Sequence, residues 1–315
     1  MFTRVTRTAA VAGTSTLLLA LAACGGGDSE SAGDSVSGSV AVDGSSTVYP
    51  MSNTAAELIL EDFPDIQVSV GFSGTGGGFE KFCGGETDIS DASRPIKDEE
   101  AAVCDEAGVD FTELLVATDA LTVVVNPDLA IDCLTTDQVI SLFGPGSDVD
   151  NWSDLDPSFP DEGITGFIPG TDSGTYDYMA ADVVGDDSEA LREDFESSED
   201  DNVLVQGVAG TSGGVGFFGY TYFEENEDKL KALSIDDGAG CVAPSAETAQ
   251  AGEYTPLARP LFIYVKNESY ADNAATREYV DYYIDNLTAI AETAQFIPLN
   301  DEDYAGTQAA VDSLG

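Results

Sequence analysis

The amino-acid sequence predicts an α/β protein in which two lobes are joined by two crossover strands. From about residue 40 onward, strand-like segments are followed by short loops and then by segments of helical apolar spacing, an order typical of α/β folds. Residues 121–125 and 261–265 form continuous apolar runs that end in turn signals, as buried strands do. Three of the loops are rich in Ser, Thr and Gly and lead directly into helical patterns.

The individual elements follow from the apolar spacing, taken in chain order. In the first part of the chain it predicts strands over 39–42 and 66–72 and helices over 51–63, 77–82 and 97–107. Further on it predicts helices over 135–143, 176–184 and 274–293 and strands over 164–168, 203–208 and 215–220. The last helix carries an apolar stripe that we interpret as core, namely Tyr279, Val280, Tyr283, Ile284 and Leu287.

The two apolar runs divide the chain between the lobes. We expect residues 40–121 together with 262–315 to form the first lobe and residues 122–261 to form the second. Two of the Ser/Thr/Gly loops then belong to the first lobe and one to the second. Because ligands of α/β sheets bind outside the carboxyl ends of the strands, the loops are expected to face each other across a cleft.

The N-terminus predicts export and a lipid anchor. Arg4 and Arg7 precede an apolar stretch over 8–20 that is too short to span a bilayer. The stretch ends in Leu-Ala-Ala-Cys at residues 21–24, which resembles the lipobox of bacterial lipoproteins and implies a signal peptide over 1–23 and a lipidated Cys24. Residues 24–39 would then be a flexible tether. The alternative is an ordinary secretory signal followed by a cysteine by chance.

The charge of the chain is extreme. The 315 residues include 59 Asp and Glu against 11 Lys and Arg, a formal net charge of −48, while 43% of the residues are hydrophobic. We therefore expect a folded protein with an acidic surface, suited to a salt-rich environment and so to a halophilic source. Nucleic acid is excluded as a partner because no basic patch is present.

Four cysteines follow Cys24, and in an exported chain they predict two disulfides. Three pairings are possible. We favour Cys83–Cys104 and Cys133–Cys241, because each bond then stays within one predicted lobe. A metal site is the alternative, and it is disfavoured because the chain contains neither a CxxC motif nor a histidine.

The three Ser/Thr/Gly loops, at residues 44–47, 73–78 and 171–175, predict an oxyanion pocket. A helix N-terminus presents unpaired N–H groups and partial positive charge, while Ser and Thr hydroxyls add further donors. Arg94 lies in a loop just before Pro95 and would bring a guanidinium fork to the anion. Its alternative role is a surface ion pair with one of the many carboxylates.

Other phosphate and catalytic motifs fail on their residue types. The dinucleotide pattern breaks at Phe79, where its third glycine should stand, and the chain has no GK[ST] element of a P-loop. Residues 210–214 are similar to a serine-protease nucleophile motif. Without histidine, a Ser-His-Asp mechanism is not available.

Six segments together resemble the PstS-type phosphate-binding lipoproteins of ABC importers. They are Gly-Ser-Ser-Thr-Val-Tyr-Pro at 44–50, Gly-Thr-Gly-Gly-Gly-Phe at 74–79, Asp-Ala-Ser-Arg-Pro-Ile at 91–96, the run at 120–127, Asp-Ser-Gly-Thr-Tyr-Asp-Tyr at 172–178 and the tail at 296–299. The resemblance implies a two-lobed periplasmic-binding-protein fold (type II). Such a protein closes on inorganic phosphate and presents it to an ABC permease with its ATPase. It also implies a lipid-anchored extracytoplasmic monomer without catalysis, cofactor or metal.

The resemblance also implies which residues bind the anion. Ser46 and Thr47 would donate from the first loop and Thr75 with the Gly76 amide from the second. Ser173 and Thr175 with the Gly174 amide would donate from the third.

Two positions depart from the best-known branch of the family. Ser93 stands where that branch has an Asp that accepts the phosphate proton, and Pro169 stands where it has an Arg. Arg94 would replace the missing Arg, and Asp172 is the candidate acceptor. The uncertain acceptor leaves sulfate or molybdate as alternative ligands. A phosphoester hydrolase and an adhesion or scaffold lipoprotein are the remaining alternatives.

Overall fold

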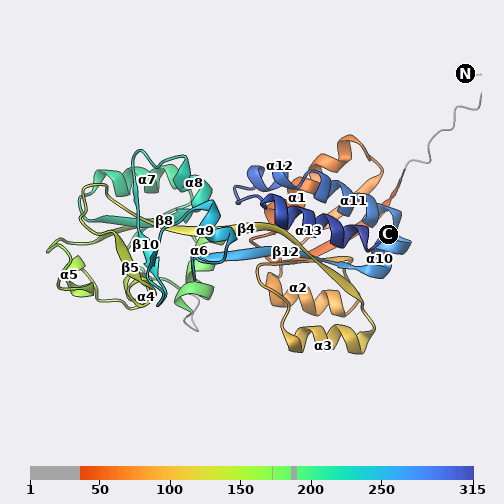
Figure 1. Ribbon diagram of the computed structural model, residues 1–315, viewed down its shortest axis with the longest axis horizontal. Helices are drawn as coiled ribbons and strands as arrows, with labels where there is room; N and C mark the ends of the chain where they lie inside the picture. The colour runs from red at the N-terminus through yellow and green to blue at the C-terminus, as the bar shows by residue number, and fades with distance from the viewer. Residues whose placement is uncertain (1–35, 172, 186–189) are drawn as a thin grey trace, which may run out of the picture. The chain divides into compact units, whose positions relative to one another are not determined.

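The structure is a computed structural model that describes residues 36–171, 173–185 and 190–315 (Figure 1). The predicted signal peptide, Cys24, most of the predicted tether and Asp172 therefore lie outside the described residues. No helix of the described residues is long and apolar enough to cross a membrane.

The main sheet runs through both halves of the described chain. Its strands are β1 (Gly38–Gly44), β2 (Ile66–Val70), β3 (Ile89–Ala92), β4 (Phe111–Val125), β6 (Thr165–Pro169), β7 (Glu196–Ser198), β8 (Gly214–Gly219), β9 (Lys231–Ala232) and β12 (Ala258–Lys266). They are ordered β2-β1-β3-β12-β4-β8-β6-β7, and β9 pairs with β4. A smaller sheet is ordered β11-β10-β5 and consists of β11 (Cys241–Val242), β10 (Ser234–Asp236) and β5 (Cys133–Thr135).

The two predicted crossover runs are adjacent strands. They form parts of β4 and β12, which pair antiparallel along nearly the whole length of β12. On its other edge β12 pairs with β3, whereas the last five residues of β4 pair with β8. β4 and β12 therefore join the strands that precede residue 121 to those of the middle segment (Figure 1). The predicted α/β class and its two crossover strands are confirmed.

Helices cover both faces of the strands formed by the first and last parts of the chain. They are α1 (Tyr49–Leu58), the 3₁₀ turn η1 (Ile59–Glu61), α2 (Gly74–Cys83), α3 (Asp98–Ala107), α10 (Asn267–Asp272), α11 (Ala274–Asp285), α12 (Leu287–Thr293) and α13 (Asp301–Asp312). Figure 1 shows α1, α11, α12 and α13 on one side of β4 and β12, with α2 and α3 on the other. The predicted stripe from Tyr279 to Leu287 is buried in this core, as expected.

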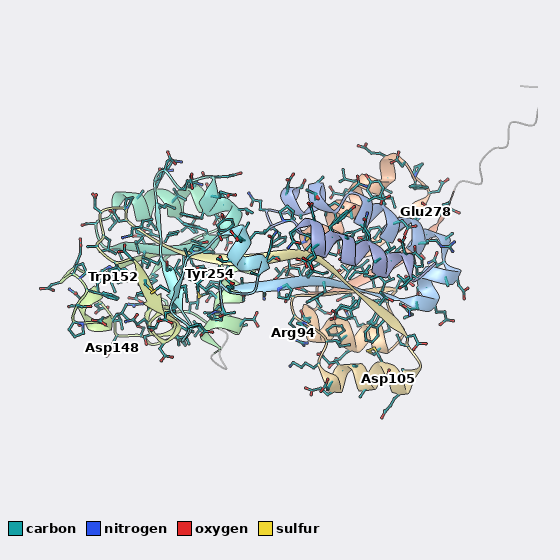
Figure 2. The ribbon with its side chains drawn as sticks, in the orientation of Figure 1. Arg94, Asp105, Asp148, Trp152, Tyr254 and Glu278 are labelled. Carbon is teal, nitrogen blue, oxygen red and sulfur yellow. A yellow bond between two sulfur atoms is a disulfide. The ribbon has the colours of Figure 1, made fainter. Side chains whose placement is uncertain are left out.

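The middle segment packs around a separate apolar core. Its helices are α4 (Thr136–Phe143), α5 (Trp152–Leu155), α6 (Gly174–Asp177), the π-helical η2 (Tyr178–Val184), α7 (Asp201–Gly210), α8 (Tyr220–Glu224) and α9 (Ala246–Gln250). Trp152 and Tyr254, labelled in Figure 2, are fully buried there beside Phe143 and Phe217. The segment thus has a hydrophobic core of its own, distinct from the core beneath α1 and α11.

The strand predicted over 203–208 is wrong, because these residues belong to α7. Asp200 caps this helix by accepting a hydrogen bond from the Asn202 amide. Leu204, Val205 and Val208 then form its buried face. A short run rich in valine fits the apolar spacing of a strand as well as that of a helix. Packing of the buried face on β6 and β8 favours the helix.

The loop predicted over 73–78 is also largely helical, since α2 begins at Gly74. A Cβ atom on Gly78 would lie 2.5 Å from the Gly44 Cα, so glycine is required where α2 packs on β1. The helix predicted over 274–293 is interrupted at Asn286.

Both disulfides are present as predicted: Cys83–Cys104 joins α2 to α3, and Cys133–Cys241 joins β5 to β11. Within the described chain no His/Cys/Asp/Glu cluster suited to a metal occurs.

Candidate functional site

A cavity of about 150 Å³ lies where the first and third predicted loops meet. Its wall includes Ser46 and Thr47 from the first loop and Gly174 and Thr175 from the third. A Cβ atom on Gly174 would lie 3.9 Å from both the Cα and the Oγ1 of Thr47, so the two loops nearly touch. The cavity is smaller than the roughly 300–1,000 Å³ of pockets for drug-sized ligands, and its size suits a small solute.

The first loop is shaped by the end of β1. Gly44 has a positive φ of 148°, and a Cβ atom there would lie 2.1 Å from the Asp91 carbonyl oxygen. The Ser45 amide donates to that carbonyl at 2.9 Å, while the Ser45 hydroxyl accepts from the Thr47 amide at 3.2 Å. These bonds turn the chain sharply, so that Thr47 reaches the cavity wall just before α1 begins.

The third loop follows the carboxyl end of β6. Ser173 is the N-cap of α6, and its hydroxyl accepts a hydrogen bond from the Thr175 amide at 3.2 Å. Gly174 and Thr175 lie on the cavity wall, whereas Ser173 is placed behind them as the cap. The structure thus brings together four of the predicted residues from two distant parts of the chain.

Four other predicted residues form a second group at α2 and the end of β3, outside the cavity wall. The Thr75 hydroxyl lies 3.2 Å from the Ser93 hydroxyl and accepts from the Ser93 amide. The Arg94 guanidinium lies over Gly76, whose added Cβ would be 4.0 Å from Nη2. Both terminal nitrogens of Arg94 donate to the Glu100 carboxylate, at 2.7 and 2.8 Å (Figure 2 labels Arg94). Here Arg94 therefore forms the ion pair that the sequence left open as its alternative role.

Arg259, on β12, is the cation beside the cavity, and the sequence analysis did not single it out. It is the cross-strand partner of Asp119 on β4, and its Nε donates to the Asp119 carboxylate at 3.2 Å. Its Nη2 donates to the Thr47 hydroxyl at 2.8 Å, and its Nη1 donates to the Asp182 carboxylate on η2. The guanidinium carbon lies 3.6 Å above the ring of Tyr178. The only available signals in the sequence were that few basic residues follow Cys24 and that Arg259 stands just before the crossover run at 261–265.

The electrostatics of the site are dominated by carboxylates around this guanidinium. Asp119 lines the cavity and is 6% exposed, and its burial raises its pKa although Arg259 partly offsets the effect. The charge of Asp182 also acts on Arg94 and contributes to raising the pKa of that guanidinium, after the larger effect of Glu100. Asp182 therefore interacts with both Arg259 and Arg94. Its charge links Arg259, beside the cavity, to the second group of predicted residues, which includes Arg94.

Comparisons with known proteins agree with this architecture. The chain matches the family model described as a PBP superfamily domain over residues 29–286. It is 46% identical over 273 residues to the protein SphX of Synechococcus elongatus, covering 85% of this chain and 80% of the relative. It is 38% identical over 298 residues to the phosphate-binding protein PstS of Staphylococcus saprophyticus, covering 94% and 91%. A solved structure described as a possible phosphate binding protein from Planctomyces limnophilus superposes with a TM-score of 0.85 at 40% identity, over 89% of this chain and 99% of that one.

Two crossover strands, two cores and a small polar cavity between distant loops are typical of a solute-binding protein, and the family match assigns this class to the PBP superfamily. Within that superfamily the chain belongs to the PstS family. The relatives are binding proteins, so the prediction that the chain is not an enzyme is confirmed by its family.

Proposed function

We propose that this protein captures inorganic phosphate outside the cytoplasm and delivers it to an ABC permease with its ATPase. The observation that carries the proposal is the approach of Thr47 to Gly174, which brings two Ser/Thr/Gly loops to one small cavity. Each loop precedes a helix, where backbone N–H groups are available to an oxyanion. The names of the PstS relatives supply the identity of the anion.

The mechanism that we propose is closure of two lobes on the anion. Residues 40–121 with 262–315 would move as one lobe against residues 122–261, with β4 and β12 as hinges. Ser46, Thr47, Thr75 and the Gly76 amide would donate from the first lobe, assisted by Ser93 and Arg94. Ser173, the Gly174 amide and Thr175 would donate from the second. A lipid on Cys24 would hold the monomer at the membrane surface, close to its permease.

Selection of phosphate over sulfate requires a group that accepts a proton. Hydrogenphosphate can donate a hydrogen bond to a carboxylate, whereas sulfate has no proton to donate and is repelled. Asp172, the predicted acceptor, lies outside the described residues. The described cavity wall includes Asp119 and Asp201, and both carboxyl groups have a raised pKa because of burial. In its ionised form, either carboxylate would accept a hydrogen bond from hydrogenphosphate, whereas sulfate has no proton to donate to it.

Calorimetric titration of the purified protein with phosphate and with sulfate tests the proposal. We expect phosphate to bind at least about 100-fold more tightly than sulfate, because unpaired buried polar groups penalise the wrong ligand. Thr175→Val should weaken phosphate binding by about 10-fold, since it removes a donor hydroxyl from the cavity wall. Thr293→Val is the matched control, because the exposed Thr293 hydroxyl donates only to its own helix at Ala289. Equal affinity for the two anions would contradict the phosphate assignment.

A further inference from the structure

Arg259 is held beside the cavity by four groups from three parts of the chain. Asp119 belongs to β4, Thr47 to the first loop, and Asp182 and Tyr178 to η2. The Arg259 side chain is only 11% exposed, as is expected for a guanidinium fixed by this many contacts. Its position is therefore determined by the fold and does not depend on a flexible surface geometry.

The two carboxylates on Arg259 differ in how firmly they are held. The Asp119 side chain is 9% exposed and lies on the neighbouring strand, opposite Arg259. The Asp182 side chain is 54% exposed and can return to water at little cost. Asp182 also lies on η2, which follows the third loop and α6, and its charge reaches Arg94. Asp182 therefore lies where the guanidinium groups of Arg259 and Arg94 attract negative charge. A carboxylate is itself a small oxyanion, so this position would also suit an oxyanion ligand.

We propose that Arg259 is a cationic ligand of the bound anion, and that the Asp182 carboxylate occupies Nη1 of Arg259 until the anion replaces it. This inference rests on the proposed function, because it concerns the same anion site. The exchange keeps the number of hydrogen bonds on the guanidinium constant while it moves one negative charge out of the site. In a chain with a net charge of −48, removal of that charge favours the entry of an anion.

Arg259 also determines what Thr47 offers to the ligand. The Thr47 hydroxyl oxygen accepts a hydrogen bond from Nη2 of Arg259. A hydroxyl has one donor hydrogen and two acceptor lone pairs, so this contact leaves the Thr47 hydrogen free to donate. Because Thr47 lines the cavity, that hydrogen is available to an anion oxygen. Arg259 thus acts on the anion directly and also through the orientation of a predicted donor.

The test is titration calorimetry with inorganic phosphate on the wild type and on two variants with opposite expected effects. Arg259→Gln should weaken binding by about 10- to 100-fold, the range of a charge-assisted contact. Asp182→Asn should strengthen binding by about two- to fivefold, because it removes a competing, partly exposed carboxylate. A purely structural role of the Arg259–Asp182 pair would make both variants weaker. Tighter binding by Asp182→Asn is therefore the decisive result.

Matched controls separate the site effect from a general change in charge. Arg277→Gln removes the same charge from an arginine that donates to the backbone at Tyr270 and Ala271. Asp105→Asn removes a carboxylate from the exposed face of α3 (Figure 2). Both controls should bind phosphate within about twofold of the wild type, as expected for distant surface charges.

The outcomes distinguish this inference from the proposed function. A wild type that binds no phosphate overturns the proposed function itself. A wild type that binds phosphate, with Asp182→Asn unchanged or weaker, overturns the exchange at Arg259. Retained affinity in a folded Arg259→Gln protein, verified by its circular dichroism, overturns Arg259 as a ligand. If Arg259→Gln does not fold, Arg259→Lys replaces it and should remain at least about fivefold weaker, because Lys lacks the fork geometry.

Discussion

Asp91 is a fully buried carboxyl group at the end of β3, close to the first loop. The Ser52 hydroxyl donates to its Oδ1 at 2.9 Å, while Oδ2 has no hydrogen-bond partner among the described residues. Burial raises the pKa of Asp91 to about 8, an effect that Ser52 only partly offsets. Asp91 is therefore largely neutral at pH 7, unlike the exposed carboxylates that give the chain its charge.

The raised pKa of Asp91 makes stability depend on pH in a defined direction. Between the usual pKa of about 3.8 and the raised pKa of about 8, the folded state holds a proton that the unfolded state has released, so the free energy of unfolding falls as pH rises through this range and levels off above it. Between pH 5 and 8 this residue alone accounts for a loss of roughly 2–4 kcal/mol. Asp91→Asn should reduce that slope. Urea unfolding at several pH values measures how the free energy of unfolding changes with pH in the wild type and in Asp91→Asn.

The exposed Asp105 provides the comparison for Asp91. Asp105→Asn removes a carboxylate of the same type from the surface of α3 and should leave the pH slope as in the wild type. Parallel pH profiles for the wild type and Asp91→Asn would show that Asp91 is ionised in the folded protein.

At the scale of single residues, local motifs indicate which residues line the cavity but not which cation lies beside it. Thr47, Gly174 and Thr175 were predicted from local motifs, because a Ser/Thr/Gly loop before a helix is visible in a few consecutive letters. Arg259 depends on a cross-strand register with Asp119 and on a contact with Thr47, which is 212 residues away. No local pattern contains such information.

At the scale of elements, those with a clear pattern in their own sequence are predicted well, whereas those that depend on packing against distant elements are not. The two crossover strands and the helices predicted over 97–107 and 135–143 have strong periodicity or length and are confirmed, whereas the helix predicted over 274–293 is divided at Asn286. Residues 203–208 were predicted as a strand, because six residues with three valines fit both periods until the contacts of α7 are known. The helical start at Gly74 was missed for a related reason, since glycine is a poor helix former unless close packing requires it.

The Cys133–Cys241 disulfide stabilises the smallest structural unit, the sheet of β5, β10 and β11. It links positions 108 residues apart, and Cys241 is exposed, so replacing it removes little packing. On the chain-entropy account, a loop of this length contributes about 5 kcal/mol to stability, against about 3 for the 21-residue separation of Cys83–Cys104. The double variant Cys133→Ala/Cys241→Ala should therefore unfold at a clearly lower urea concentration.

Reduction of the double variant gives a second comparison for the Cys133–Cys241 bond. Adding a thiol to the double variant should cause a further loss, because only Cys83–Cys104 then remains to be reduced. An unchanged urea midpoint in the oxidised double variant would contradict a stabilising role for the bond.

At the scale of the whole molecule, the excess of carboxylates adds a repulsive contribution to the free energy of the folded state. Five of the nine basic residues after Cys24 form ion pairs with described carboxylates, for example Lys81 with Asp43 and Arg192 with Asp194. Most of the 59 carboxylates therefore have no cation to balance them. The resulting repulsion acts over about 10 Å at 0.1 M salt and about 3 Å at 1 M salt. This is the physical basis of the predicted preference for a salt-rich environment.

Sodium chloride should therefore stabilise the protein at neutral pH. We expect the midpoint of thermal unfolding to rise between 0.05 and 1 M salt, because screening weakens repulsion more in the compact state than in the expanded one. The control is the same series near pH 4, close to the isoelectric point of about 4.1, where the net charge is small and the rise should largely disappear. An equal rise of the midpoint at both pH values would mean that salt stabilises the protein because it is excluded from the protein surface, an effect that does not depend on charge. That result would contradict the charge-based argument for a halophilic source.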